Sequence, residues 1–200
     1  MFFKSYKVVP YPNPFLLLIK IHRMQRRSFL MISLLAAPVL MLAKPPKKKR
    51  PDKGIKVDAG KDRFNSPIMH GLDLKLSGKD TDGDLCIFES TAPKKSGSPM
   101  HIHHHQDEWF YVFEGEMIIK VGNDTFHMKP GDSVFAPRGV PHADYIVSDG
   151  TRRLSLFQPA GSIEGFFGKL SKMKTFPASR KLKKLYHEFG MDIIGPPLVV

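Results

Sequence analysis

The sequence predicts an all-β domain, a sandwich or small barrel, followed by one or two short helices. From about Phe64 onward, short apolar or alternating runs recur every eight to twelve residues, and Gly, Pro, Asn or Asp separates them. No helical period appears in this part of the chain, whereas two later segments place apolar residues at helical spacing. Short strands joined by tight turns are typical of sandwiches and small barrels.

Each predicted strand is an apolar, aromatic or alternating run that ends at a turn. Gly78–Gly83 supplies the first turn, and Glu114–Glu116 and Gly122–Asp124 supply two hairpin turns. The predicted strands are Leu72–Leu76, Leu85–Phe88, Trp109–Phe113, Met117–Val121, Thr125–Met128, Ser133–Ala136, Tyr145–Val147 and Leu154–Phe157. Cys86 is the single cysteine, so we expect a buried strand residue there and no intramolecular disulfide.

The chain changes character after Ala160. Ser162–Lys172 and Ser179–Phe189 combine apolar residues at helical spacing with many lysines. One or two short helices there are expected to cover an edge or an end of the barrel. Because no internal repeat is present, we predict one barrel at residues 64–160 and a helical tail at residues 161–200 that packs on it.

The first 43 residues are interpreted as a targeting segment. The paired arginines of Arg26–Leu30 precede an apolar run that ends at Ala43, which is the order of an export signal. Arg26–Leu30 also resembles the core of a bacterial twin-arginine signal. We therefore predict an exported, periplasmic protein, with Met24 as an alternative start. An uncleaved leader that anchors the protein in a membrane, or a cytoplasmic protein with a mispredicted leader, are the alternatives.

The basic charge of the chain is concentrated in its first 60 residues. These hold thirteen Lys or Arg against Asp52 and Asp58, whereas residues 61–200 hold eighteen basic and seventeen acidic side chains. Residues 44–63, rich in Lys and Pro, are expected to form a basic flexible linker. Since the predicted barrel is close to neutral, the formal charge of +12 does not indicate a nucleic-acid partner, and we expect none.

One short segment and one distant histidine carry the chemistry. His101 and His103 are two residues apart, so in an extended strand both imidazoles point to one face. Glu108 follows a short loop, and His142 follows a Pro/Gly turn. Three imidazoles and one carboxylate suit one divalent transition-metal ion: Fe(II), Mn, Ni, Co, Cu or Zn. In an octahedral ion this set leaves one or two positions for water, substrate or O2.

The other histidines are weaker candidates for ligands. His105 shares strand parity with His101 and His103, so the pair His103 and His105 is an alternative register that leaves only two residues before the carboxylate. Otherwise His104 and His105 are expected at the rim of the site. His127 lies on a predicted strand and faces either the cavity or solvent. Three histidines have no partner pattern: His22, His70 and His187.

These ligands resemble the paired signature motifs of the cupin superfamily. The two motifs read His101-x-His103-x4-Glu108-x6-Gly115 and Gly131-x5-Pro137-x-Gly139-x2-His142. Fifteen residues separate them, a spacer typical of single-domain microbial cupins. Two positions depart from the family pattern: Lys95 stands in place of the opening glycine, with Gly97 nearby, and Ile146 stands in place of an asparagine. Neither position is a ligand, so the departures concern local turn geometry.

The resemblance implies a cupin double-stranded β-helix, or jelly-roll barrel, over roughly residues 65–160, and homodimers that pair through sheet edges. The tail also resembles the quercetin-dioxygenase-like branch. That implies a metal-dependent dioxygenase acting on a small-molecule substrate, with Glu108 as ligand and catalytic proton acceptor. Cupins with the same ligands include isomerases and non-catalytic ligand-binding or sensing proteins, which are the alternatives. A further acid or base in the pocket would separate these classes, and the candidates are His105, His127 and Tyr145.

Overall fold

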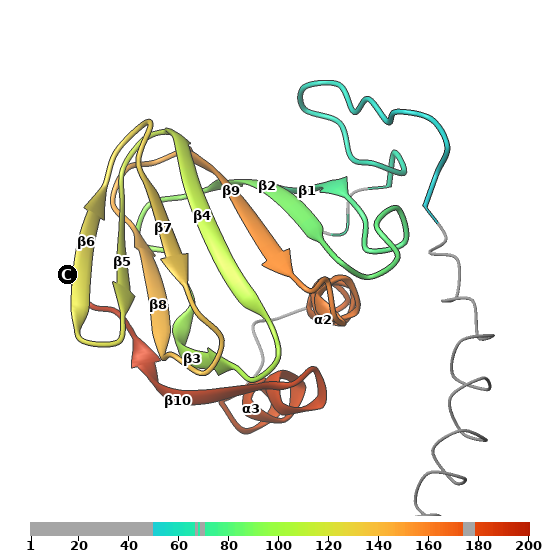
Figure 1. The fold of residues 1–200 in the computed structure, drawn as a ribbon. Helices are drawn as coiled ribbons and strands as arrows, with labels where there is room; N and C mark the ends of the chain where they lie inside the picture. Colours follow the sequence, from blue (N-terminus) through green and yellow to red (C-terminus); the bar gives the residue numbers. More distant parts are fainter. Residues whose placement is uncertain (1–49, 67, 69–70, 174–178) are drawn as a thin grey trace, which may run out of the picture. The chain divides into compact units, whose positions relative to one another are not determined.

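Ten strands and two helices form the part of the chain that the computed structural model describes, which is residues 50–66, 68, 71–173 and 179–200 (Figure 1). The predicted leader with its paired arginines, the first residues of the linker, His22 and His70 lie outside these ranges, so export stays a prediction. Within these ranges, no helix combines the length and the apolar character that crossing a membrane requires.

The strands form two five-stranded antiparallel sheets that face each other (Figure 1). One sheet has the order β1-β2-β9-β4-β7, and the other has the order β10-β3-β8-β5-β6. The elements are β1 (Leu72–Leu76), β2 (Cys86–Ala92), β3 (Pro99–His103), β4 (Asp107–Glu114), β5 (Met117–Val121), β6 (Asp124–Met128), β7 (Ser133–Ala136), β8 (His142–Ile146), β9 (Thr151–Gln158), α2 (Ile163–Leu170), α3 (Ser179–Glu188) and β10 (Met191–Pro197). This arrangement confirms the predicted all-β jelly roll.

Strand β4 shows why the alternating runs become strands. Glu108, Phe110 and Val112 are buried on its inner face, because successive side chains of a strand point to opposite faces. The residues between them form a ladder of aromatic rings on the outer face: Trp109, Tyr111 and Phe113. The inner face therefore contributes one carboxylate and two apolar side chains to the barrel interior.

The C-terminal tail contains both predicted helices and a strand that was not predicted. The helices α2 and α3 begin and end within two residues of their predicted bounds. Met191–Pro197 then pairs antiparallel with β3 and forms an edge of the second sheet. A seven-residue run ending in Gly195-Pro196-Pro197 has little strand signal of its own. The unpaired backbone of β3 supplies the missing partner, which only the tertiary fold brings into place.

The last residues of the predicted linker lie against the barrel. Asp62 is 5% exposed, and its carboxylate accepts hydrogen bonds from the backbone N–H groups of Phe64 and Leu74, both at 2.9 Å. Arg63 donates its backbone N–H to Leu74 and forms an ion pair with Asp80 at 3.0 Å. A buried carboxylate thus attaches the C-terminal end of the predicted linker to the barrel.

The turn around Lys95 and Gly97, where the chain departs from the cupin motif, has a clear local geometry. Lys95 has a φ of +65°, the left-handed conformation that glycine adopts without steric cost. Its backbone N–H donates to the carbonyl of Ile146 at 2.8 Å, which holds the turn in this conformation. A Cβ atom on Gly97 would lie 2.1 Å from the carbonyl oxygen of Asp144, so only glycine fits at this close approach of two backbones.

The interior is divided into two apolar clusters. One cluster lies where the helices meet the first sheet and includes Phe88, Phe157, Phe166 and Leu182. The other lies among β4, β5, β7 and β8. Cys86 is fully buried in the first cluster, as predicted.

Candidate metal centre

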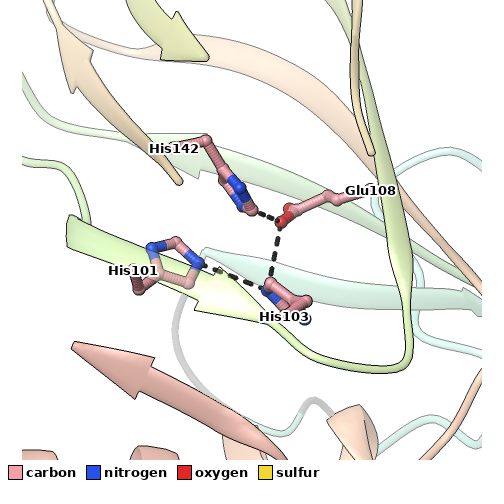
Figure 2. Close-up of side chains that lie close together, drawn as sticks. All are labelled: His101, His103, Glu108 and His142. Carbon is pink, nitrogen blue, oxygen red and sulfur yellow. Dashed lines mark hydrogen bonds and ion pairs between the residues drawn. The ribbon is translucent and has the colours of Figure 1, made fainter. Parts of the chain in front are cut away.

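Four side chains from three strands converge inside the barrel (Figure 2). His101 and His103 extend from the inner face of β3, Glu108 from β4 and His142 from β8. Each is between 2% and 6% exposed, and their ligand atoms all lie within 4.8 Å of one another. The structure therefore brings together the four residues that the sequence singled out.

Local backbone contacts place the two motifs side by side. His101 and His142 are direct partners in the pairing of β3 with β8. The N–H of Gly139 donates to the carbonyl of His103 at 2.8 Å, and the N–H of Val140 closes a turn on Pro137 at 3.1 Å. The Pro/Gly turn of the second motif is thus attached to β3 directly, and it delivers His142 to the site.

The second ring nitrogen of each histidine faces an oxygen. Nδ1 of His101 lies 2.8 Å from the carbonyl oxygen of Pro99, and Nδ1 of His142 lies 3.1 Å from that of Val140. Nδ1 of His103 lies 3.4 Å from Oε1 of Gln106. Because these oxygens only accept, each Nδ1 carries the proton and donates it. The neutral rings consequently direct the lone pairs of Nε2 toward the centre, as metal-binding histidines do.

The inward-facing atoms of His101, His103 and Glu108 are acceptors with no donor among them, an arrangement that a bound cation would stabilise. Nε2 of His101 and Nε2 of His103 lie 3.2 Å apart, and in neutral rings both are acceptors. Oε2 of Glu108 lies 3.5 Å from Nε2 of His103 and 3.2 Å from Nε2 of His142. Buried acceptors that face one another are costly unless a proton or a metal ion lies between them. The donor set therefore fits one divalent transition metal.

Burial tunes the protonation of this cluster. Desolvation, aided by the neighbouring imidazoles, lowers the pKa of His101 to about 3, and desolvation also lowers the pKa of His103. Burial alone would raise the pKa of Glu108 and lower that of His142, but the hydrogen bond between them reverses both directions. The carboxylate is held ionised, and two imidazoles are held neutral. These are the protonation states in which the residues bind a metal.

Gln106 orients the site, although its sequence position gave no sign of this. Its Nε2 donates to the carbonyls of Pro159 and Ala160 at 3.1 and 2.7 Å, so Oε1 must face His103. Partners of this kind typically change metal affinity about 10- to 100-fold. We expect Gln106→Leu to weaken metal affinity by about that factor, measured by competition with a chromogenic chelator.

Gln158→Leu, at an exposed position of β9, is the matched control and is expected to leave the affinity unchanged. Equal affinities in the two variants would show that Gln106 does not orient His103.

The alternative histidines do not reach the centre. His104 and His105 are exposed, and Nε2 of His104 lies 2.8 Å from Asp192. His127 is exposed on β6, and Tyr145 is partly exposed and does not line the cavity described below. His187 pairs with Asp192 at the surface. The three candidates for a further acid or base in the pocket thus lie elsewhere.

A cavity of about 230 Å3 opens onto the centre between the two sheets. Its wall includes His101, His103 and Glu108, together with Phe88 and Phe157. Besides four serines, three further residues with charged or phenolic side chains line it that were not predicted: Asp144, Arg153 and Tyr186. For Asp144 a signal existed, since it lies two residues after His142 on the same strand face. Arg153 and Tyr186 come from segments that gave no such signal.

The segment that contains all four ligands matches a known family. The family model described as "Cupin domain" matches residues 86–156. These residues form a cupin domain. The metal centre and most of the barrel lie within the matched segment, so the resemblance of the paired motifs is confirmed.

Known cupins and related proteins match parts of the chain. It is 30% identical over 92 residues to quercetin 2,3-dioxygenase of Bacillus subtilis, covering 46% of this chain and 27% of that protein. It is 37% identical over 59 residues to an uncharacterized protein of Streptomyces coelicolor, covering 30% of this chain and 56% of that protein. The chain thus spans only part of the length of these curated relatives.

Solved structures also match part of the chain. The structure of KdgF from a Halomonas species is 20% identical with a TM-score of 0.41, and covers 44% of this chain and 79% of that chain. An RmlC-like cupin from Shewanella frigidimarina is 25% identical with a TM-score of 0.39, and covers 45% and 78% of the two chains.

Proposed function

We propose that this cupin is a metal-dependent oxygenase that acts on a small organic molecule. The observation that carries the proposal is the set of three inward Nε2 atoms and one buried carboxylate at the wall of a cavity. The partial similarity to quercetin 2,3-dioxygenase of Bacillus subtilis supports oxygenase chemistry over other cupin reactions. A second argument is that most of the cavity wall is apolar, which keeps water away from a reactive centre.

The residues of the chain have separate tasks in this proposal. His101, His103, Glu108 and His142 would hold one ion of Fe(II), Mn, Ni, Co, Cu or Zn, which polarises a substrate oxygen and lowers the pKa of a bound hydroxyl. The three imidazoles keep their orientation because their Nδ1 atoms are hydrogen-bonded. Glu108 is the catalytic proton acceptor, since its Oε2 is the ionised oxygen nearest to the centre.

Two other functions use the same residues. A non-catalytic cupin that captures a small ligand needs the cavity but no proton acceptor, and a cupin isomerase needs the proton acceptor but no O2. Metal content and O2 consumption together separate these functions from an oxygenase.

The test combines metal analysis of the purified full chain with O2 uptake. We expect about one transition-metal ion per chain, as a three-His, one-Glu site requires. We also expect O2 uptake with at least one member of a panel of flavonols and smaller enediols, lost on chelation and restored by metal. Glu108→Gln keeps the shape of the side chain but removes its charge, so uptake should fall at least about 100-fold, the lower range for general-base catalysis.

Glu114→Gln is the matched control on the same strand, since Glu114 is exposed and pairs with Arg152 at 2.7 Å. This variant should keep both the metal and the uptake. Stoichiometric metal without uptake on any member of the panel would contradict the oxygenase and favour the binding protein or the isomerase. A protein that binds no metal would contradict the metal-dependent oxygenase and the metal centre itself.

A further inference from the structure

We infer that the cavity selects a small monoanion, with its anionic group on Arg153 and an oxygen at the metal centre. This inference shares one requirement with the proposed function, which is a divalent ion bound by His101, His103, Glu108 and His142. It adds the chemical class of the ligand and the residue that recognises it.

Arg153 is a cation inside the barrel. It lies on the inner face of β9 and lines the cavity with a side chain that is 15% exposed. Its Nη1 pairs with Asp144 at 2.5 Å, and its Nε donates to Ser90 Oγ at 3.3 Å. The guanidinium also lies over the ring of Phe110, 5.7 Å from its centroid. These contacts hold the planar group in one orientation, which favours recognition of a carboxylate.

One edge of the guanidinium remains available to a ligand. No residue in the described ranges accepts a hydrogen bond from Nη2 of Arg153. This nitrogen is also not one of the fully buried atoms that lack a hydrogen-bond partner. Asp144 is turned toward Ser98 as well, since its Oδ1 accepts from the backbone N–H of Ser98 at 3.1 Å. Asp144 therefore positions the arginine without using all of its donors.

The charge of the cavity wall favours a ligand with one negative charge. The charged side chains in the described wall are Glu108, Asp144 and Arg153, and the histidines are neutral when they bind a metal. Asp144 and Arg153 form an ion pair at 2.5 Å, so these two charges compensate each other. With a divalent ion, the site carries one uncompensated positive charge. A monoanion neutralises it, which matters because an unpaired charge is costly away from water.

The size and spacing of the site favour a small molecule. The cavity volume of about 230 Å3 lies below the roughly 300–1,000 Å3 of pockets for drug-sized ligands. Asp144 lies two residues after His142 on the same face, so the Asp144–Arg153 pair is about 6–7 Å along the strand from a metal ligand. A short carbon chain with a carboxylate at one end and a hydroxyl or carbonyl oxygen at the other covers this span.

A purely structural role for the pair makes a different prediction. Asp144 belongs to one sheet and Arg153 to the other, so the ion pair also joins the two sheets. If joining them were its sole role, replacing both residues by neutral ones would change stability and leave ligand preference intact. The double variant Asp144→Asn with Arg153→Met tests this, because it leaves no buried charge unpaired.

The experiment compares each acid with its neutral amide. Metal-loaded full-length protein is titrated calorimetrically with glycolate and glycolamide, lactate and lactamide, and benzoate and benzamide. We expect the wild type to bind at least one acid about tenfold or more tightly than its amide, and the double variant to lose most of that ratio. Arg152→Met is the matched control, since Arg152 is the neighbouring residue and pairs with Glu89 and Glu114 instead.

Metal content measured on the same samples separates the two ideas. A wild type without metal would overturn both the proposed function and this inference. A metal-loaded wild type that binds acids and amides equally would overturn only the ligand class. A folded double variant that keeps the preference of the wild type would overturn the role of Arg153. Thermal melting of each variant shows whether it is folded.

Discussion

Replacing His142 by alanine is expected to abolish stoichiometric metal binding and to leave a folded barrel. His142 supplies one of three imidazoles, and its partner Glu108 would lose the atom that lies 3.2 Å away. Loss of a direct ligand should exceed the effect of an outer partner, so we expect affinity to fall by more than about 100-fold. His101→Ala is expected to behave in the same way, because its Nε2 also faces the centre. Metal per chain after dialysis, measured by inductively coupled plasma mass spectrometry, checks both.

His127→Ala and His105→Ala are the controls, because both histidines are exposed outside the cluster. They should retain about one ion per chain. Full metal occupancy in His101→Ala and His142→Ala would remove the basis for the centre. Loss of metal in His105→Ala with retention in His101→Ala would favour the alternative register of the strand.

Phe88→Ala is expected to lower the free energy of unfolding by about 3–5 kcal/mol, a large part of the total for a domain. The ring of Phe88 is fully buried in β2, and it packs edge-to-face on Phe157 at 6.1 Å and on Phe167 at 5.0 Å. It thereby joins the sheet to α2, and its loss leaves a cavity that these neighbours fill only in part. Urea denaturation monitored by circular dichroism measures the change. A chelator in the buffer keeps metal binding from altering the result.

Phe135→Ala is the matched control, since Phe135 is 54% exposed on β7. Its cost should stay within about 0.5 kcal/mol. If the two variants lost equal stability, the packing of α2 on the sheet would contribute little to the fold.

Local patterns in the sequence predicted the strands well. The bounds of β5 and β7 agree with the predicted Met117–Val121 and Ser133–Ala136, and the burial of Cys86 was also predicted. These features follow from the alternation of buried and exposed side chains every two residues and from the residues that form turns. Both are determined by residues that are close together in the sequence. Where the partner lies far away in the sequence, the same reasoning failed. Strand β10 and the docking of Asp62 beside β1 are the two examples.

The sequence by itself singled out the four candidate ligands of the cupin domain and the common face of His101 and His103. His101 and His103 are two residues apart on one strand, and the two motifs have the spacing of the family. The tertiary structure alone decided what surrounds them. Gln106 turns its oxygen toward His103 because two carbonyls of a distant loop hold its nitrogen, and Arg153 enters the cavity because β9 lies beside β4. Such contacts join residues separated by dozens of positions, and no local pattern encodes them. The candidate metal ligands could therefore be predicted from the sequence, and the cavity wall around them could not.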